Sequence, residues 1–174
     1  TIVHAQSNGL NAVHMHSYGL GYGASKVTAR NVDIEAGLGG GGHGIYVSAA
    51  WNGSLIGATG TNVSTIKSAN GCGVYFTGYY DNQTYSATIT NTVIYGCTSN
   101  GIHLGATVSG SAGAGSNAVQ ATLNHCTLAD NGGDGLYVLG AKAGAWARPT
   151  NCIVAYNGGA GVNLVGWGFT CTEG

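Results

Sequence analysis

The stretch Thr92–Leu104, TVIYGCTSNGIHL, contains the repeat from which the fold of this chain can be predicted. Apolar residues alternate with other residues in two short segments, Thr92–Tyr95 and Ile102–Leu104, and the residues between them include Gly and Asn. Alternation with period two is typical of β-strands, whereas Gly and Asn are typical of turns. The stretch therefore predicts a strand, a short turn and a second strand.

Both segments recur along the chain. The second one has the form Gly, apolar, variable, apolar, and its copies are Gly9–Ala12 (degenerate), Gly44–Val47, Gly73–Phe76, Gly101–Leu104, Gly135–Val138 and Gly161–Leu164. The glycines are 35, 29, 28, 34 and 26 residues apart. The first segment has an apolar residue seven positions before the Gly, or ten in the case of Ile34, and these residues are Ile34, Ile66, Ile94, Leu128 and Val154. Each repeat thus predicts two strands with a short turn between them, followed by a longer variable loop.

Two short strands cannot cover a hydrophobic face alone, but stacked copies can, which is the principle of a solenoid. The Asn/Gly turns, the β-branched inward positions and the repeat length resemble the right-handed parallel β-helix of the pectate-lyase-like superfamily over about residues 8–165. The resemblance implies an all-β, single-stranded right-handed parallel β-helix of five to six coils, which we expect to form one domain over residues 1–174. It does not specify an activity, since this architecture is found in lyases, hydrolases, tailspikes and adhesins.

Stacked coils would place equivalent residues in rows along the interior. The three rows predicted are Ile34–Ile66–Ile94–Leu128–Val154, Ile45–Val74–Ile102–Leu136–Val162 and Val47–Phe76–Leu104–Val138–Leu164. Cys126 and Cys152 occupy equivalent positions in neighbouring coils. Strands in register hold Cβ atoms about 4.8 Å apart, near the upper limit for an unstrained disulfide, so we expect buried thiols.

The outward position of the second strand predicts a row of flat side chains. Its members are Asn11, Tyr46, Tyr75, His103, Tyr137 and Asn163. Such a row either stabilises the sheet by ring stacking or forms a platform for sugar rings. Further aromatic residues fall in what we predict to be equivalent loops: Tyr18, Tyr22, Trp51, Tyr79, Tyr80, Tyr85, Trp146 and Trp167. These would cover the sheet, contact another subunit or line a glycan groove. The residues expected to bind ligand are Tyr46, Tyr75, His103, Tyr137, Trp51, Tyr79, Tyr80 and Trp146. A Gly/Ala/Ser-rich loop is predicted over residues 105–118.

Catalytic groups are scarce in the sequence. Asp130 and Asp134 flank a turn and could act as a carboxylate pair, but such residues more often cap turns through backbone hydrogen bonds. His43 lies in a Gly-His-Gly phrase that resembles one polygalacturonase motif, whereas the other motifs of that family have no match. These three residues are the weak catalytic candidates, and we expect no catalysis.

Metal sites are not predicted either. Asp33 and Glu35 share a strand face, but no neighbouring coil adds the further carboxylates that Ca²⁺ requires. His14 and His16 would share a face, and His4 is the one nearby third ligand. We therefore expect no metal and no cofactor, with Ca²⁺ at Asp33 and Glu35 as the alternative.

The composition argues against two classes of partner, nucleic acids and membranes. Charged residues make up 6% of the chain and the net charge is −1, so no basic surface for nucleic acid is expected, and no apolar run reaches the length of a membrane span. No cap is evident at either end, which indicates a fragment of a longer β-helix or a subunit that stacks on others. We expect an extracellular, cell-surface or virion-associated structural and recognition protein, such as a fibre, tailspike or adhesin segment, with a glycan as its partner. The alternatives are a polysaccharide lyase or glycoside hydrolase, and a self-assembling filament subunit.

Overall fold

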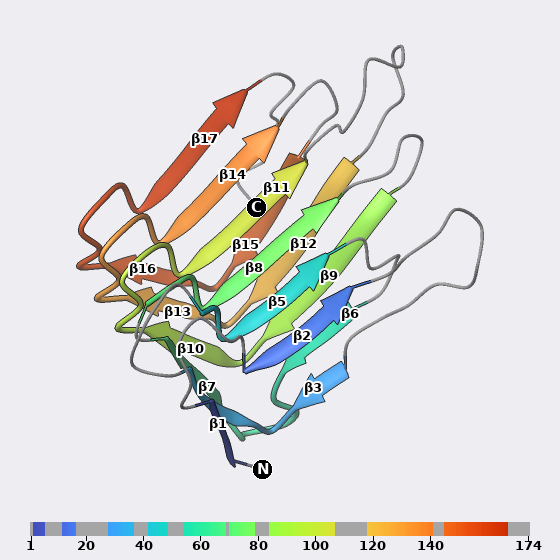
Figure 1. Cartoon of the computed structure of the whole chain (residues 1–174), viewed down its shortest axis with the longest axis vertical. Coiled ribbons are helices and arrows are strands. Elements are labelled where there is room, and N and C mark those ends of the chain that lie inside the picture. Colours follow the sequence, from blue (N-terminus) through green and yellow to red (C-terminus); the bar gives the residue numbers. More distant parts are fainter. Residues whose placement is uncertain are drawn as a thin grey trace.

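The protein consists of three parallel β-sheets that run side by side along one axis (Figure 1). This computed structural model describes residues 2–5, 12–16, 28–36, 42–48, 54–68, 70–78, 84–106, 118–140 and 145–166. The described residues form 17 strands, and they include no helix that is long and apolar enough to cross a membrane. The chain visits the first, second and third sheet in turn, five times, and then adds one strand each to the first and second. The predicted all-β parallel β-helix of five to six coils is confirmed.

The first sheet has six strands in the order β1-β4-β7-β10-β13-β16, with the bounds β1 (Ile2–Ala5), β4 (Asp33–Ala36), β7 (Ser64–Ser68), β10 (Thr92–Tyr95), β13 (Thr127–Ala129) and β16 (Ile153–Ala155). The second sheet has the order β17-β14-β11-β8-β5-β2, with the bounds β2 (Val13–His16), β5 (Ile45–Ser48), β8 (Val74–Gly78), β11 (Ile102–Ala106), β14 (Leu136–Gly140) and β17 (Val162–Gly166). The third sheet has the order β15-β12-β9-β6-β3, with the bounds β3 (Thr28–Arg30), β6 (Ser54–Gly57), β9 (Thr84–Thr90), β12 (Ala118–Asn124) and β15 (Ala145–Thr150).

The third sheet corrects the prediction of two strands and a loop in each coil. Its strands lie in the segments that we predicted to be loops, and residues 105, 106 and 118 of the predicted 105–118 loop are themselves in β11 and β12. The inward residues here are often small, as Ala87 and Ala121 are, and the outward ones are polar. Small inward residues give a weak hydrophobic alternation, which is why the sequence pattern did not reveal these strands.

The interior rows form as predicted in the first and second sheets. Ile34 pairs with Ile66, Ile66 with Ile94, and the two rows of the second sheet follow the same register from Ile45 and Val47 onward. The third sheet adds a row of its own, Ile56–Ile89–Leu123. Before the last coil these side chains are at most 2% exposed, so they form one continuous core along the axis. In the last coil Val154 is half-buried, and Val162 and Leu164 are exposed. Burial of such apolar surface is the main favourable term in folding.

The first copy of the repeat is placed differently from the prediction. We assigned it to Gly9–Ala12, but Val13 pairs with Ile45 and His14 pairs with Tyr46. The outward row therefore begins at His14 and not at Asn11, and residues 9–11 lie outside the described part of the chain.

The corner between the third and first sheets turns on one residue in the left-handed conformation. In four coils this residue has φ between 46° and 53°, and it is Asn31, Asn91, His125 or Asn151. Asn tolerates this conformation better than most residues. The amide of Asn91 also donates to the carbonyl oxygens of Ala58 (3.2 Å) and Gly60 (3.3 Å) in the preceding coil. Each corner is thus tied to its neighbour along the axis.

A buried amide pair ties the turns between the first and second sheets. Asn131 Nδ2 donates to the Ile94 carbonyl oxygen (3.4 Å), and Asn131 Oδ1 accepts from the Cys97 amide (3.2 Å). Asn157 repeats this one coil later, where its Nδ2 donates to the Leu128 carbonyl oxygen (3.1 Å). Asn131 is 2% exposed, so these bonds satisfy polar groups that would be costly to bury alone.

The cysteines Cys126 and Cys152 are equivalent in neighbouring coils, as predicted, and both are free thiols. Cys126 Sγ donates to the carbonyl oxygens of Ile89 (3.4 Å) and Asn124 (3.5 Å). Burial, together with the neighbouring Cys152, raises the pKa of the Cys126 thiol to about 12, so it stays protonated. Cys72 and Cys97 are likewise buried thiols, and Cys171 lies outside the described residues.

The close approach of successive coils explains the glycine at the start of the repeat phrase. A Cβ at Gly101 would lie 2.7 Å from the Gly135 carbonyl oxygen, and one at Gly44 would lie 2.6 Å from the Gly73 carbonyl oxygen. Successive coils approach too closely here for any side chain. Gly161 differs, because its Cβ would meet only Val154 Cγ1 at 3.6 Å, an ordinary contact.

We therefore expect Gly101→Ala to lower the free energy of unfolding by about 1–3 kcal/mol, the usual cost of forcing extra atoms into a packed site. Gly161→Ala is the matched control, since it makes the same change at the equivalent position without the clash, and it should shift stability by less than about 0.5 kcal/mol. Urea unfolding of the two variants measures both values. Equal losses would show that the close approach of the coils is not the reason for the glycine.

Candidate functional site

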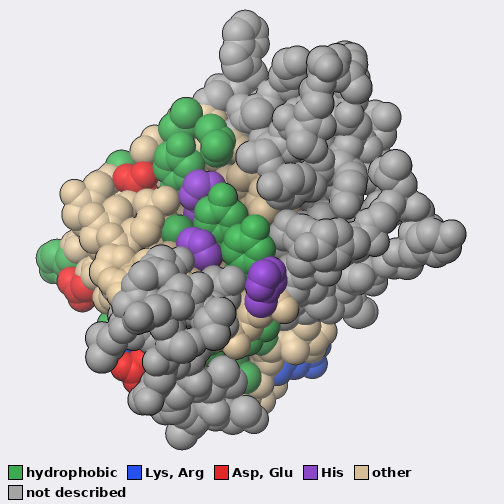
Figure 2. All heavy atoms as spheres, in the orientation of Figure 1, with side chains coloured by type: hydrophobic (Ala, Val, Ile, Leu, Met, Phe, Trp, Pro, Cys, Tyr) green, Lys and Arg blue, Asp and Glu red, His purple; other side chains and the backbone are tan. Residues whose placement is uncertain are grey.

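Parallel pairing brings one outward residue from each strand of the second sheet into a single column. The register places His14 beside Tyr46, Tyr46 beside Tyr75, Tyr75 beside His103, and His103 beside Tyr137. We call these five residues the ring stripe. Asn163 follows Tyr137 at the next level. Figure 2 shows His side chains interspersed with hydrophobic ones on this face of the molecule.

The rings of the stripe stack on one another. Tyr46 and Tyr75 are nearly parallel, at 9° with centroids 5.3 Å apart, and Tyr75 and His103 are 4.4 Å apart at 26°. His14 meets Tyr46 edge-on at 4.8 Å and 80°. These separations are close to the distance between hydrogen-bonded strands, about 4.8 Å. The sheet spacing therefore sets the stacking, and the stacked rings cover much of one another's faces.

Tyr137 is the exception within the stripe. Its ring is tilted by 44° against His103, with centroids 4.8 Å apart. On its other side the next outward residue is Asn163 rather than a ring. Tyr137 therefore leaves more of its ring face uncovered by other rings than Tyr75 does, whose neighbours on both sides are rings.

His43 joins the stripe from the turn before β5. Its ring lies 4.7 Å from Tyr75 and 5.7 Å from Tyr46, between centroids. His43 Nδ1 accepts a hydrogen bond from the Cys72 amide at 3.0 Å. This nitrogen is therefore engaged, which leaves it unable to act as a general base. From the sequence, His43 is only a weak catalytic candidate, and nothing in the strand pattern indicates that a turn residue would stack here.

Two imidazoles on this face, those of His43 and His103, are neutral at neutral pH. Burial lowers the pKa of His43. Burial, and secondarily the proximity of His43, lowers the pKa of His103 to about 4. Both imidazoles therefore have one N–H and one unprotonated nitrogen, and in His43 the unprotonated nitrogen is Nδ1, which accepts from the Cys72 amide. The stripe is a surface of ring edges, hydroxyl groups and imidazole nitrogens.

Asp130 and Asp134, which we considered as a catalytic pair, both lie in turns of the backbone. Asp134 Oδ1 accepts from the Ala160 amide (2.7 Å), and its Oδ2 accepts from Asn163 Nδ2 (2.9 Å). Asp130 is exposed and takes the left-handed conformation after β13, with φ of 54°. Asp134 thus bonds the turn of the next coil, as expected of a turn residue, and also holds the amide of Asn163 at the end of the stripe.

The residues predicted to bind ligand do not all come together. Tyr46, Tyr75, His103 and Tyr137 share the stripe. We predicted Trp146 to lie in a loop beside the stripe, and this prediction is wrong. Trp146 lies in strand β15 of the third sheet, where the Arg148 guanidinium lies 4.8 Å from the centroid of its ring. Trp51, Tyr79 and Tyr80 are outside the described residues, as are Tyr18, Tyr22 and Trp167.

The possible ligands of a metal ion are dispersed or occupied. The Thr65 hydroxyl donates to Asp33 Oδ1, and Lys67 Nζ lies 3.7 Å from Glu35 Oε1 on the exposed face of the first sheet. Within the described ranges, no group of three or more His, Cys, Asp or Glu residues could hold a metal ion.

The low pKa of His103 makes stability depend on pH. The unfolded chain takes up a proton near the ordinary histidine pKa of 6.5, whereas the folded protein does so only at about 4. The free energy of unfolding should therefore fall as pH is lowered through this interval and level off below it. We expect His103→Phe to flatten this dependence and the exposed-site control His125→Asn to retain it, as measured by thermal unfolding from pH 4 to 7. An unchanged pH dependence in His103→Phe would contradict the assignment.

Comparison with known proteins agrees with this architecture. The sequence model of the family described as right handed beta helix region matches residues 7–172. No curated protein and no solved structure matches the chain. The match spans nearly the whole chain, and the three stacked parallel sheets are the structure that this family description implies. The chain belongs to the family of right-handed β-helix proteins.

Proposed function

We propose that this chain is a non-catalytic recognition β-helix of an extracellular, cell-surface or virion-associated structure, and that it binds glycan through the ring stripe. The supporting observation is the stripe itself, a row of partly exposed rings on a continuous parallel sheet, in which the His103 imidazole and the adjacent His43 imidazole are neutral at physiological pH. The sheet carries few charged groups that could bind a partner. Tyr, however, combines a large apolar contact area with a hydroxyl group that can form hydrogen bonds.

The geometry favours contact with sugar hydroxyls over face-to-face stacking along most of the stripe. The faces of Tyr46 and Tyr75 are turned toward one another, so ring edges and hydroxyl groups remain for a ligand. At Tyr137 the ring is tilted and its neighbour on one side is Asn163 rather than a ring, so this is the place in the stripe where a sugar ring would pack on an aromatic face. Asp134 orients the Asn163 amide beside that place, so a sugar there would meet an apolar face and a fixed amide.

A glycan array with the whole chain tests this proposal. We expect Tyr137→Ala to weaken retention by about tenfold or more, as removal of a central aromatic contact commonly does. Tyr75→Phe keeps the stack and removes one hydroxyl, so it should weaken retention by a few fold. Tyr95→Ala is the matched control, because Tyr95 is also an exposed tyrosine, at 39%, but lies on the first sheet.

Two outcomes would count against the proposal. If Tyr137→Ala and Tyr75→Phe bind as well as the unaltered chain, the stripe serves only to stabilise the sheet. If the chain releases reducing ends or unsaturated products from polysaccharides, and Asp134→Asn abolishes the release, the alternative of a polysaccharide-degrading enzyme holds instead.

A second candidate function, assembly by stacking of coils, has its own supporting observation. Val162 and Leu164 belong to the interior rows but are 43% and 39% exposed, whereas their partners Leu136 and Val138 in the preceding coil are buried. A further coil, from this chain or another, would bury them and extend the hydrogen-bond ladder of β17. The exposed apolar side chains of Val162 and Leu164 are consistent with the alternative of a self-assembling filament subunit.

Sedimentation at increasing protein concentration tests the assembly. Leu164→Asp places a charge on the stacking surface and should shift the protein toward the monomer. Val165→Asp is the control, because Val165 is equally exposed but alternates to the outward side of β17. A chain that stays monomeric at every concentration would argue against self-assembly.

A further inference from the structure

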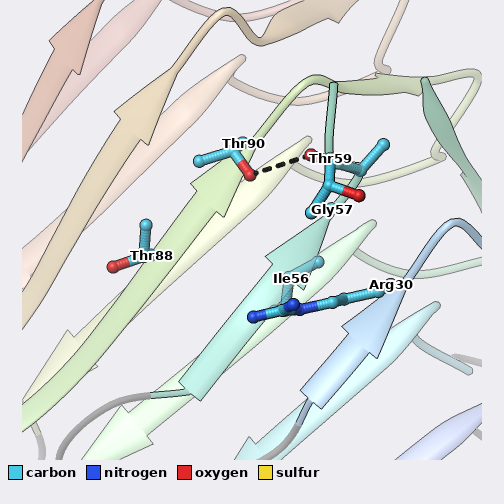
Figure 3. Close-up of a pocket in the computed structure, with 7 residues that line it drawn as sticks. Arg30, Ile56, Gly57, Thr59, Thr88 and Thr90 are labelled. Carbon is cyan, nitrogen blue, oxygen red and sulfur yellow. Dashed lines mark hydrogen bonds between the residues drawn. The ribbon is translucent and has the colours of Figure 1, made fainter. Parts of the chain in front are cut away.

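The outer face of the third sheet contains a notch that the ring stripe does not explain. Outward positions at the strand ends align across the sheet in the order Arg30, Gly57, Thr90, Asn124, Thr150. Gly57 has no side chain, so the column is interrupted between Arg30 and Thr90. The interruption is a hollow of about 70 Å³, lined by Arg30, Ile56, Gly57, Ala58, Thr59, Thr88 and Thr90 (Figure 3).

The backbone requires this interruption. Gly57 has a φ of 131°, which side-chain-bearing residues rarely adopt, and a Cβ there would lie 1.8 Å from the Thr90 carbonyl oxygen. The neighbouring corner is fixed by hydrogen bonds: the Thr59 amide donates to Asn31 Oδ1 (3.3 Å), and the Thr90 hydroxyl donates to the Ala58 carbonyl oxygen (3.4 Å). The notch is therefore a preformed feature of the sheet.

One cation and one hydroxyl group are available at the notch. In Figure 3 the Arg30 side chain extends from β3 across β6, so its guanidinium lies over the strand that carries Ile56 and Gly57. No hydrogen bond or ion pair joins the Arg30 guanidinium or the Thr88 hydroxyl to another residue in the described ranges. Ile56, whose side chain belongs to the interior row, and Ala58 also line the hollow, and each is 2% exposed.

Charge is segregated between the sheets. The described strands of the third sheet contain Arg30 and Arg148 but no Asp or Glu. The carboxylates nearest in sequence, Asp33 and Glu35, lie beyond the corner on the first sheet, where Thr65 and Lys67 engage them. No acidic side chain of the described strands of this sheet therefore competes for Arg30.

We propose that the notch binds a single oxyanion group, a carboxylate or a sulfate, with the Arg30 guanidinium as its cation and the Thr88 hydroxyl as a second donor. A guanidinium presents two parallel N–H groups that match the two oxygens of such a group. The hollow has room for only a few heavy atoms, which suits a group of this size. The ligand is either a free anion or the acidic group of a sugar. This site lies on the third sheet, so it stands independently of glycan binding by the ring stripe.

Nuclear magnetic resonance titration of the whole chain tests the proposal, with sulfate, a galacturonate oligomer and neutral galactose as probes at constant ionic strength. We expect saturable shifts of the Arg30 Nε–H and Thr88 methyl signals with sulfate, galacturonate or both, and none with galactose. Arg30→Gln should weaken binding by about tenfold or more, and Thr88→Val by a few fold.

Arg148→Gln is the matched control. It removes a second exposed arginine of the same sheet, at the opposite edge and away from the hollow. Arg30-dependent binding of sulfate would identify a site for a free oxyanion, and Arg30-dependent binding of galacturonate alone would identify a site for an acidic sugar. Equal loss in Arg30→Gln and Arg148→Gln would indicate diffuse charge attraction and overturn the proposal, as would the lack of saturation with either anion.

Discussion

The hydrogen-bond ladder between parallel strands in register is the interaction on which the rest of this structure depends. Each coil lies directly on the preceding one, so every side chain is stacked on its equivalent at the strand spacing of about 4.8 Å. The interior rows of isoleucine, valine and leucine, the amide pair of Asn131 and Asn157, and the ring stripe all follow from that one repeat distance. The same distance excludes a side chain from Gly44, Gly73, Gly101 and Gly135, where backbones meet.

The strands in which large apolar residues alternate with other residues could be predicted from the sequence. The apolar residues flanking Gly101 and Gly135 are large and regularly spaced, and the register they imply is the register found. The third sheet could not be predicted in the same way, because its inward residues include Ala87 and Ala121, which resemble loop residues in a hydrophobicity pattern. The first coil was misplaced because Gly9 imitates the repeat phrase, whereas the pairing partner of Ile45 is Val13.

The candidate site, like the fold, could be predicted from the sequence only in part. Tyr46, Tyr75, His103 and Tyr137 occupy one strand position and were found by period and spacing alone. His43 reaches the stripe from a turn, and its position depends on a hydrogen bond to the amide of the next coil, at Cys72, which no spacing rule contains. The notch at Gly57 likewise depends on a residue that lacks a side chain, so a search for chemically active residue types passes over it. Ring orientation is also a three-dimensional property: the predicted platform of ring faces is largely a stack of faces turned toward each other.

Because each coil pairs only with the coils beside it, the protein is close to a one-dimensional chain of units, and opening can begin at either end without disturbing the middle. Backbone amides of the central strands β8 and β11 should consequently exchange their hydrogens with solvent most slowly, and those of the outermost strands fastest. Tyr75 and His103 lie on strands that have a partner strand on both sides, whereas β3, which carries Arg30, pairs on one side only among the described residues. We therefore expect the centre of the stripe to be more rigid than the strand that carries Arg30.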